Sequence, residues 1–359
     1  YVLAYNGEIY NHIELRNKLI RLGERFVGRS DTEVLLRVIE RWGLVAALRL
    51  ANGMFALALW DTWERSLQLA RDRLGEKPLY YGFHRNRWLF ASELKALRAH
   101  PDFRPIIDRD VVAAFMRDSF VSGPRSIYEG ISKLPPGTIV ELRWGTNVPP
   151  VPVSFWSLYD VVVSHKDRLV DEEAALDELD HLLRDAVKLR MQADVPLGAS
   201  LSGGIDSSLV VALMQEQSTR PVRTFTIGMS PIQYDESGEA ARVAAALGTD
   251  HTELRISSSD ALELIPELPR IWDEPFGDSS QIPTLLISHL ARSCVTVSLC
   301  GDGGDELFGG YNRYTWALDL WAGMRRIPRP ARVLAARGLN AVSPRRWEQL
   351  LTNIESVLP

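Results

Sequence analysis

Leu197-Gly-Ala-Ser-Leu-Ser-Gly-Gly-Ile-Asp-Ser-Ser208 runs from a short apolar strand, through a glycine-rich turn, into a helix. The strand is predicted over Leu197–Leu201 and the helix over Ser207–Gln217. Between them, Ser202–Ser208 presents backbone N–H groups and the positive end of a helix, where a polyphosphate can bind. A glycine-rich turn closed by a capping Asp or Ser is the plain structural alternative. The stretch has no Walker lysine, so it predicts a phosphate-binding loop of another kind.

The surrounding sequence repeats the same alternation of strand and helix. Asp171-Glu-Glu opens a helix with acids at its positive end. Further on, strands are predicted over 222–227 and 295–300, and a helix over 236–247. This alternation is typical of an α/β, doubly wound parallel sheet, in which ligands bind beyond the carboxyl ends of the strands. Residues following Leu201, Ile227 and Cys300 are therefore candidate ligand contacts.

The first part of the chain has a different pattern. A strand is expected over Tyr1–Tyr5, then two helices begin at Asn11 (with Glu14) and Ser30 (with Glu33) and end at Gly23 and Gly43. Short apolar runs at 54–60, 67–70, 79–83 and 88–91 predict antiparallel strands. These elements indicate a layered α+β domain over residues 1–144. The proline-rich stretch that follows predicts a linker over 145–165 and a second domain over 166–359.

Composition excludes several classes of protein. The 359 residues are 46% hydrophobic and 24% charged, which is typical of globular domains, and the formal net charge of -5 argues against a nucleic-acid binder. Two cysteines, Cys294 and Cys300, cannot form a disulfide framework or a zinc site, and a reducing cytoplasm fits their number. The sequence contains no apolar run long enough for a membrane span.

A second glycine-rich stretch adds acidic side chains. It is Gly301-Asp-Gly-Gly-Asp-Glu-Leu-Phe-Gly-Gly310, and its spacing fits neither the dinucleotide-binding fingerprint nor a calcium-binding EF-hand loop. Carboxylates are the oxygen ligands that Mg²⁺ prefers, so Asp206 and Asp305 are the predicted metal ligands.

Together with Asp273-Glu-Pro-Phe-Gly-Asp-Ser-Ser280, these stretches resemble the synthetase domain of the asparagine synthetase family, within the ATP pyrophosphatases. That superfamily cleaves ATP to AMP and pyrophosphate. The resemblance places Asp302 beside the reacting carboxylate. It implies an ATP site formed by Leu201, Ser202, Gly203, Gly204, Asp206, Ser207, Ile227, Cys300 and Gly301.

Two residues depart from the pattern of that family, in which many members have Ser at Cys300 and Glu at Asp302. Shortening an acid by one methylene moves its carboxylate by about 1 Å, which matters for positioned chemistry, so the role of Asp302 is an open question. A nucleophilic role for Cys300 is the alternative to a structural one, and a cysteine that closes a buried apolar strand is expected to be structural.

Five stretches of the first domain are similar to the class II glutamine amidotransferases: residues 5–11, 30–33, 52–56, 71–80 and 90–95. By itself, 5–11 reads equally well as a strand, a turn and a helix cap. The resemblance implies an N-terminal-nucleophile-hydrolase-like fold, an oxyanion hole at Asn6 and Gly7, and a glutamine site that also includes Glu8 and Asp31. The nucleophilic cysteine of that family has no match in the chain and lies before Tyr1 in the family, and the family continues beyond Pro359, so we expect a protein truncated at both ends.

The reaction implied by both resemblances is asparagine synthesis from aspartate, glutamine, water and ATP, through β-aspartyl-AMP, with Mg²⁺ as cofactor. Glutamate, AMP and pyrophosphate are the other products. The alternative is a related amidotransferase or β-lactam-synthetase-like enzyme that acts on another carboxylic acid. The expected partners are glutamine, aspartate and ATP, with neither nucleic acid nor membrane, and a cytoplasmic homodimer fits the family.

Overall fold

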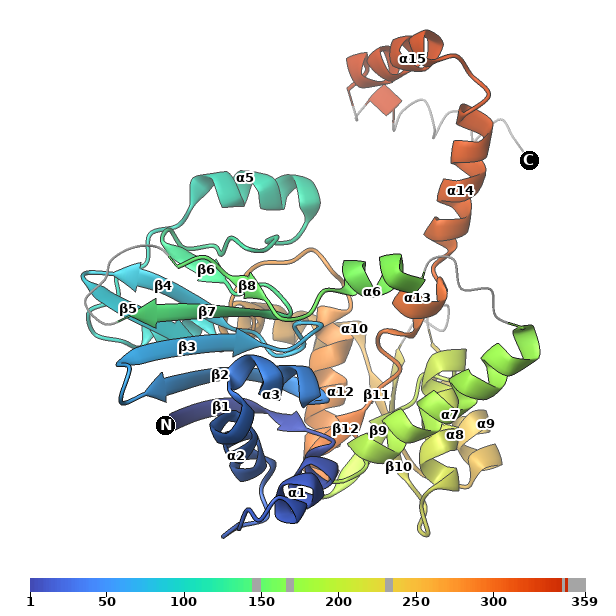
Figure 1. Cartoon of the computed structure of the whole chain (residues 1–359). Helices are drawn as coiled ribbons and strands as arrows, with labels where there is room; N and C mark the ends of the chain where they lie inside the picture. The colour runs from blue at the N-terminus through green and yellow to red at the C-terminus, as the bar shows by residue number, and fades with distance from the viewer. Residues whose placement is uncertain (144–149, 166–170, 230–234, 344–345, 348–359) are drawn as a thin grey trace. The chain divides into compact units, whose positions relative to one another are not determined.

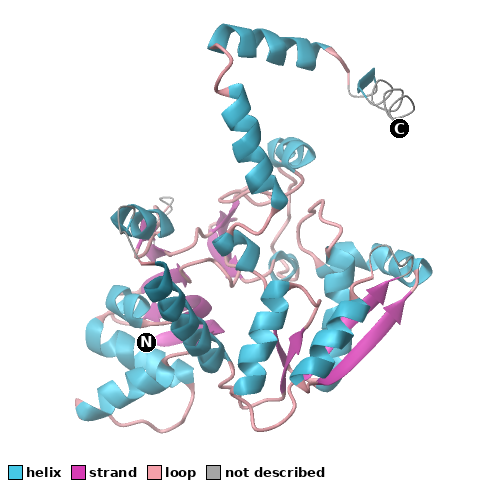
Figure 2. Ribbon diagram, turned by 90° about the vertical axis from the view of Figure 1, so that its right-hand side faces the viewer, coloured by secondary structure: helices cyan, strands magenta, loops and turns pink. Residues whose placement is uncertain are grey.

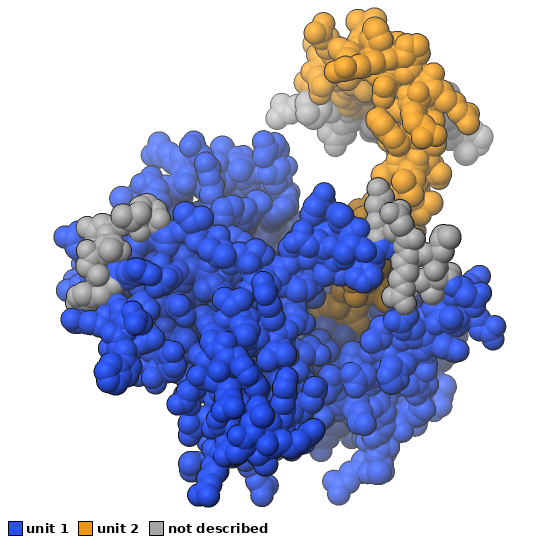
Figure 3. All heavy atoms as spheres, viewed as in Figure 1, with its two compact units in different colours: residues 1–300 blue, residues 301–359 orange. Residues whose placement is uncertain are grey.

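The computed structural model describes residues 1–143, 150–165, 171–229, 235–343 and 346–347 (Figure 1). It divides into two compact units, residues 1–300 and 301–359 (Figure 3).

The first unit opens with a five-stranded antiparallel sheet in the order β1-β2-β3-β7-β8. Its strands are β1 (Val2–Ile9), β2 (Gly53–Asp61), β3 (Ser66–Arg71), β7 (Thr138–Arg143) and β8 (Val153–Ser154). Strand β1 is longer than predicted, because it continues through Asn6, Gly7 and Glu8 to Ile9. Residues 5–9 are therefore strand rather than turn. Among the described strands, β1 is the first in the order and pairs through one edge only, so its other edge is open there.

Three helices cover one face of this sheet and supply most of its core: α1 (His12–Arg21), α2 (Asp31–Trp42) and α3 (Leu44–Leu50). Helix α2 begins as predicted, because the Ser30 hydroxyl accepts from the Glu33 N–H. The prediction for α1 was wrong in one respect. Asn11 precedes the helix but does not cap it, since its side chain bonds instead to the Leu50 carbonyl and the Asn52 N–H.

A smaller antiparallel sheet, in the order β5-β4-β6, lies between the strands of the first one in the sequence. It consists of β4 (Tyr80–His84), β5 (Arg87–Ala91) and β6 (Ile131–Lys133). Helices α4 (Leu94–Arg98) and α5 (Arg109–Asp118) pack with it around a second core, in which Leu94 is fully buried. The predicted antiparallel arrangement is confirmed for both sheets.

The segment predicted as a linker contributes regular structure. Strand β8 pairs with β7, and Phe155 is 5% exposed in the core under the first sheet. Helix α6 (Leu158–His165) follows. The proline-rich stretch therefore returns to the sheet before the chain leaves it, while residues 144–149 lie outside the described part.

The rest of the first unit contains a four-stranded parallel sheet, as predicted, in the order β11-β10-β9-β12. Its strands are β9 (Leu197–Ser200), β10 (Arg223–Met229), β11 (Asp250–Ile256) and β12 (Val297–Leu299), of which β11 was not anticipated. Figure 2 shows helices beside these strands. They are α7 (Glu172–Arg190), α8 (Ile205–Glu216), α9 (Ser237–Leu247), α10 (Ser258–Leu264), η2 (Ile265–Glu267), α11 (Leu268–Ile271) and α12 (Gln281–Cys294).

Two separate cores flank this sheet. Ala199 belongs to a core shared with α7, α8 and α9, whereas Phe225 packs with Ala291 and Val295 at the end of α12. From β9 the chain proceeds to β10 and β11, then returns to place β12 on the other side of β9. The strand order therefore reverses between β9 and β12.

The second unit is helical in its described part. It contains α13 (Gly304–Phe308), α14 (Asn312–Met324) and α15 (Arg329–Ala341). No helix in the described ranges of either unit is long and apolar enough to cross a membrane.

Candidate functional site

The open edge of β1 carries a backbone donor at Gly7. Gly7 lies opposite Phe55 of β2, whose N–H donates to the Asp72 carboxylate (3.1 Å) and whose carbonyl accepts from the Asp72 N–H (2.8 Å). Both polar groups of Phe55 therefore point away from β1. In an antiparallel pair this makes Gly7 and Phe55 a non-hydrogen-bonded pair, so the Gly7 N–H points outward from the sheet edge.

Gly7 also has a packing reason to be glycine. A Cβ placed there would lie 2.2 Å from the Met54 carbonyl oxygen. The close approach of β1 and β2 therefore excludes any side chain at this position.

Asn6 and Glu8 point to one face of β1, opposite to the face of Leu3, Tyr5 and Ile9 that packs against the core. The Asn6 amide nitrogen donates to the Ser92 hydroxyl at 3.0 Å. An amide nitrogen carries two hydrogens, so the second one remains for another acceptor. Asn6 and Gly7 thus place two N–H donors side by side at an accessible strand edge.

Asp31, at the start of α2, lies against the same strand. Its Oδ2 accepts from the Ile9 N–H and the Tyr5 hydroxyl, both at 2.9 Å, and its Oδ1 accepts from the Thr32 hydroxyl at 3.2 Å. Burial and the neighbouring Asp31 raise the pKa of Tyr5, so this phenol stays a donor. Asp31 therefore has a structural role that the sequence interpretation missed.

Glu8 is electrostatically coupled to Asp31. Burial raises the pKa of Glu8, and the charge of Asp31 raises it further. A cation beside Glu8 and Asp31 would offset the effect of the Asp31 charge on Glu8. The arrangement can accept an ammonium group next to the donors of Asn6 and Gly7.

The glycine-rich turn after β9 is held by hydrogen bonds among its own residues. The Ser202 and Ser207 hydroxyls are 2.9 Å apart, Ser207 Oγ accepts from the Ser202 N–H, and Ser202 Oγ accepts from the Gly204 N–H. Gly203 has φ +85° and packs so closely on α9 that a Cβ would lie 2.7 Å from Glu239 Cβ. The turn is therefore a fixed loop at the start of α8.

Several residues of the predicted ATP site lie at one end of the parallel sheet, where its strands reach their carboxyl ends. Leu201 is fully buried directly after β9, and Asp206 lies half-buried in the first turn of α8. Because β12 is parallel to β9 and adjacent to it, Cys300 and the Ser202 loop emerge at the same end of the sheet. Ile227 differs from the prediction, since β10 continues to Met229 and Ile227 is still paired within it.

The prediction that Cys300 is buried was wrong. Strand β12 covers only Val297–Leu299 at the edge of the sheet, and both Cys294 and Cys300 are exposed. Cys294 is the last residue of α12 rather than part of a strand. An edge strand is covered less completely than a central one, which the apolar run alone could not reveal.

Gly301, Asp302 and Asp305 belong to the second unit. Asp302 is exposed, and Asp305 lies in the first turn of α13 with its carboxylate against Gly310. Glu306 accepts from the Tyr311 hydroxyl at 2.7 Å, and this bond lowers the pKa of Glu306. Within the described ranges, no three His, Cys, Asp or Glu side chains are grouped closely enough to hold a metal ion.

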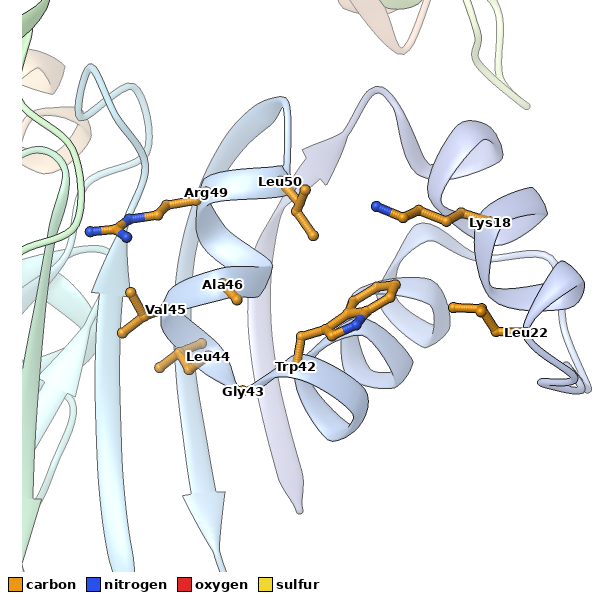
Figure 4. Close-up of a pocket in the computed structure, with 9 residues that line it drawn as sticks. All are labelled: Lys18, Leu22, Trp42, Gly43, Leu44, Val45, Ala46, Arg49 and Leu50. Carbon is orange, nitrogen blue, oxygen red and sulfur yellow. The ribbon is translucent and has the colours of Figure 1, made fainter.

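A large surface pocket of the first unit lies among its first three helices. It has a volume of about 890 Å³ and is lined by α1, α2 and α3, including Trp42, Leu50 and Lys18 (Figure 4). None of the predicted site residues lines it. The candidate chemistry therefore lies at strand ends and edges rather than in this pocket.

Comparison with known proteins gives a consistent assignment to both halves of the chain. A family model described as asparagine synthase matches residues 178–357, and one described as a glutamine amidotransferase domain matches residues 1–156. The chain is 36% identical over 342 residues to a putative asparagine synthetase (glutamine-hydrolyzing) 2 of Methanocaldococcus jannaschii, covering 94% of this chain and 64% of that protein. It is 36% identical over 321 residues to asparagine synthetase (glutamine-hydrolyzing) 1 of Bacillus subtilis, and the match covers 89% of this chain and 49% of that protein.

The chain thus spans between about half and about two thirds of the length of these relatives. A solved glutamine phosphoribosylpyrophosphate amidotransferase of B. subtilis is more distant. It has 17% sequence identity and a TM-score of 0.32, and the match covers 70% of this chain and 60% of the solved chain.

Proposed function

Because this chain belongs to the asparagine synthase family, we propose that the full-length protein is a glutamine-dependent asparagine synthetase, an ATP-dependent carbon–nitrogen ligase. It converts aspartate, glutamine, water and ATP into asparagine, glutamate, AMP and pyrophosphate through β-aspartyl-AMP. One observation carries the proposal: the Ser202 loop and Cys300 emerge together where the strand order reverses, between β9 and β12. In open parallel sheets this is the place where ligands bind.

In the nucleotide half, the backbone N–H group of Gly203 and the start of α8 bind the pyrophosphate of ATP. Ser202 and Ser207 hold this loop in shape through their mutual hydrogen bond. Leu201, Ile227, Cys300 and Gly301 line the adenosine. Asp302 lies by the aspartate β-carboxylate, which attacks the α-phosphorus.

Magnesium fits the donor set of this half. In the described part of the chain, the carboxylates of Asp206 and Asp305 accept no hydrogen bond and join no ion pair. Both therefore keep the oxygen ligands that Mg²⁺ prefers. The ion neutralises charge on the phosphates when it is bound.

In the glutamine half, the Asn6 amide and the outward Gly7 N–H stabilise the oxyanion that forms when the glutamine amide is attacked. Glu8 and Asp31 bind the α-ammonium group of glutamine. The raised pKa of Glu8 supports this role, because a cation beside the two carboxylates relieves their repulsion. Ammonia released here displaces AMP from β-aspartyl-AMP.

The architecture proposed for these activities has two domains. Residues 1–144 form an N-terminal-nucleophile-hydrolase-like domain, 145–165 a linker, and 166–359 an ATP-pyrophosphatase domain wound on both faces of its sheet. The separate cores around Ala199 and Phe225 support winding on both faces. We place the enzyme in the cytoplasm as a homodimer.

A second candidate function changes only the acceptor acid. Asp302 is one methylene shorter than the Glu that many family members have, so the acceptor bound beside it can differ from aspartate. Such an enzyme would amidate another acid or close a β-lactam, with the same ATP chemistry.

The test is product analysis with the full-length protein. With aspartate, ATP, Mg²⁺ and glutamine, we expect equal amounts of asparagine, AMP and pyrophosphate. Replacing glutamine by ammonium should preserve asparagine formation. Pyrophosphate release that requires an acid other than aspartate would favour the second candidate, and the absence of AMP with every acid would contradict both.

A further inference from the structure

Asp273 connects the parallel-sheet part of the first unit with the start of α4. It lies between α11 and α12, yet its Oδ2 accepts from the Leu94 N–H at 2.6 Å and its Oδ1 from the Lys95 N–H at 3.0 Å. The Lys95 ammonium lies 3.6 Å from Oδ1 and donates to the Ile271 carbonyl at 3.0 Å. The Asp273 side chain is 10% exposed, so these bonds are shielded from water.

Glu274 fixes the same segment at three more points. Its Oε1 accepts from the Ile127 N–H at 2.8 Å, and its Oε2 contacts the Lys133 ammonium at 2.6 Å and the Tyr80 hydroxyl at 3.3 Å. Burial, followed by the charge of Glu274, raises the pKa of Tyr80, which keeps it a donor. Asp273 is therefore held in place by its own neighbour in the sequence.

Helix α4 depends on Asp273 because its own flanking residue does not cap it. Glu93 precedes the helix and makes no side-chain bond to its N–H groups. Asp273 instead satisfies the N–H groups of Leu94 and Lys95 from a distance of almost 180 residues along the chain. Unpaired buried N–H groups are costly, so loss of this carboxylate would displace the start of α4.

Ser92 lies two residues before Leu94 and accepts the hydrogen bond from Asn6. A shift at the start of α4 therefore moves the partner that orients the Asn6 amide. The contacts form a continuous series: Asp273, the start of α4, Ser92 and Asn6.

We propose that Asp273 is a positioning residue for glutamine hydrolysis, which acts through Ser92 to orient the oxyanion donor Asn6. This inference rests on the proposed function of Asn6. It means that a segment within the asparagine synthase match controls the geometry of the glutamine site. Ser92 restrains one amide hydrogen of Asn6 and so aims the other one at the oxyanion.

Asp273→Asn is the main test variant, because it keeps the size of the side chain but presents an NH₂ group to one of two N–H donors. In the full-length protein we expect kcat for glutamine hydrolysis to fall about 10-fold, less than the ~10²–10³ that follows removal of an oxyanion donor. KM for glutamine should change less than twofold, because the loss concerns the transition state. Asparagine formation from ammonium should stay within twofold of the wild type.

Two further variants separate positioning from general damage. Ser92→Ala should lower kcat to a similar extent, and the double variant should be no worse than the more affected single variant, because both act on Asn6. Glu267→Gln is the matched control: it lies on the same segment in an exposed pair with Arg270, and it should have no effect. Asp273→Ala, which removes both acceptors without placing an NH₂ group against an N–H donor, should lower kcat to a similar extent and serves if Asp273→Asn does not fold.

The outcomes are distinct. Unchanged glutaminase kcat in both Asp273 variants, losses that multiply in the double variant, or equal loss with both nitrogen donors would each overturn the inference. A wild type without glutaminase activity would instead overturn the proposed function. In that event the Asn6 side-chain amide signal of the chain Tyr1–Pro359 is compared by NMR: a shift in Asp273→Asn, absent in Glu267→Gln, supports the inference, and no shift overturns it.

Discussion

The backbone N–H of Ile9 donates to the carboxylate of Asp31 at 2.9 Å, joining the open edge of β1 to the first residue of α2. On the same strand Gly7 also points its N–H outward, but toward the accessible part of the edge. The Ile9 donor therefore fixes the strand to the start of α2. The same Asp31 oxygen accepts from Tyr5, so the carboxylate is restrained before any ligand binds.

Asp31 should have separable effects on binding and on stability. Asp31→Asn retains an oxygen that can accept from Ile9 and Tyr5 but removes the charge, so we expect KM for glutamine to rise at least 10-fold with little loss of stability. Asp31→Ala also leaves the Ile9 N–H and Tyr5 hydroxyl without their acceptor, which should cost about 1–3 kcal/mol of unfolding free energy. Steady-state kinetics and thermal unfolding of the full-length protein measure both effects. Equal loss of asparagine synthesis from glutamine and from ammonium would show that Asp31 is only structural.

Glu8 should make the stability of the protein depend on pH. Burial and Asp31 raise its pKa above the ordinary 4.5, so the folded state binds the proton more tightly than the unfolded state does. The stabilising contribution is fully present below pH 4.5 and is lost as pH rises through the folded pKa. Glu8→Gln removes this titration. Thermal unfolding measured at several pH values should show that the variant gains stability relative to the wild type as pH rises, and a constant difference would contradict the raised pKa.

Local sequence signals predicted most of the elements on which these arguments depend. Ser30 and Gly43 marked the limits of α2, and apolar runs marked β2 to β5, because each signal acts over a few residues. Strand β11 was missed because its alternation includes charged residues on the exposed sides of an edge strand. The exposure of Cys300 was missed for a related reason. The apolar residues 295–300 predict a strand, but only the strand order of the sheet shows that this strand lies at its edge.

The contacts that orient the site were beyond local patterns. The bonds from Asn6 to Ser92 and from Leu94 to Asp273 join residues separated by 86 and 179 positions. Residues 90–95 and 273–280 stood out in the sequence as similar to two families, but nothing in either stretch indicated that they bind each other. Only the fold brings their polar groups together.

Asp206 and Asp305 should be required for the ATP reaction and not for folding. Asp206→Asn or Asp305→Asn removes one charge from the proposed Mg²⁺ ligands, whose electrostatic contribution is worth several kcal/mol in the transition state, so pyrophosphate release should fall by about 10²-fold or more. Glu216→Gln, at the other end of α8 from Asp206, is the control and should retain full activity. Release of pyrophosphate is followed with aspartate and ATP, together with thermal unfolding. Near-normal release in either variant would remove the metal assignment.

Asp72 should be the most sensitive acid of the first unit for stability, because it is 1% exposed and organises the loop beside β2. Its Oδ1 accepts from the Leu74 and Glu76 N–H groups, and its Oδ2 from those of Phe55 and Lys77. In Asp72→Asn, an NH₂ group would face two of these donors, which should cost on the order of 3 kcal/mol of unfolding free energy.

Asp61→Asn is the matched control for this change. Asp61 also accepts from two backbone N–H groups, those of Trp63 and Glu64, but through one oxygen in an exposed turn. Its asparagine variant can keep that oxygen in place, so the cost should be about 1 kcal/mol or less. Urea unfolding gives the two free energies, and hydrogen exchange at Phe55 and Lys77 locates the loss. Faster exchange at both amides in Asp72→Asn alone is the expected result. Because the bond from Phe55 to Asp72 is also the evidence that the Gly7 N–H points outward, similar exchange in both variants would remove the support for that donor as well.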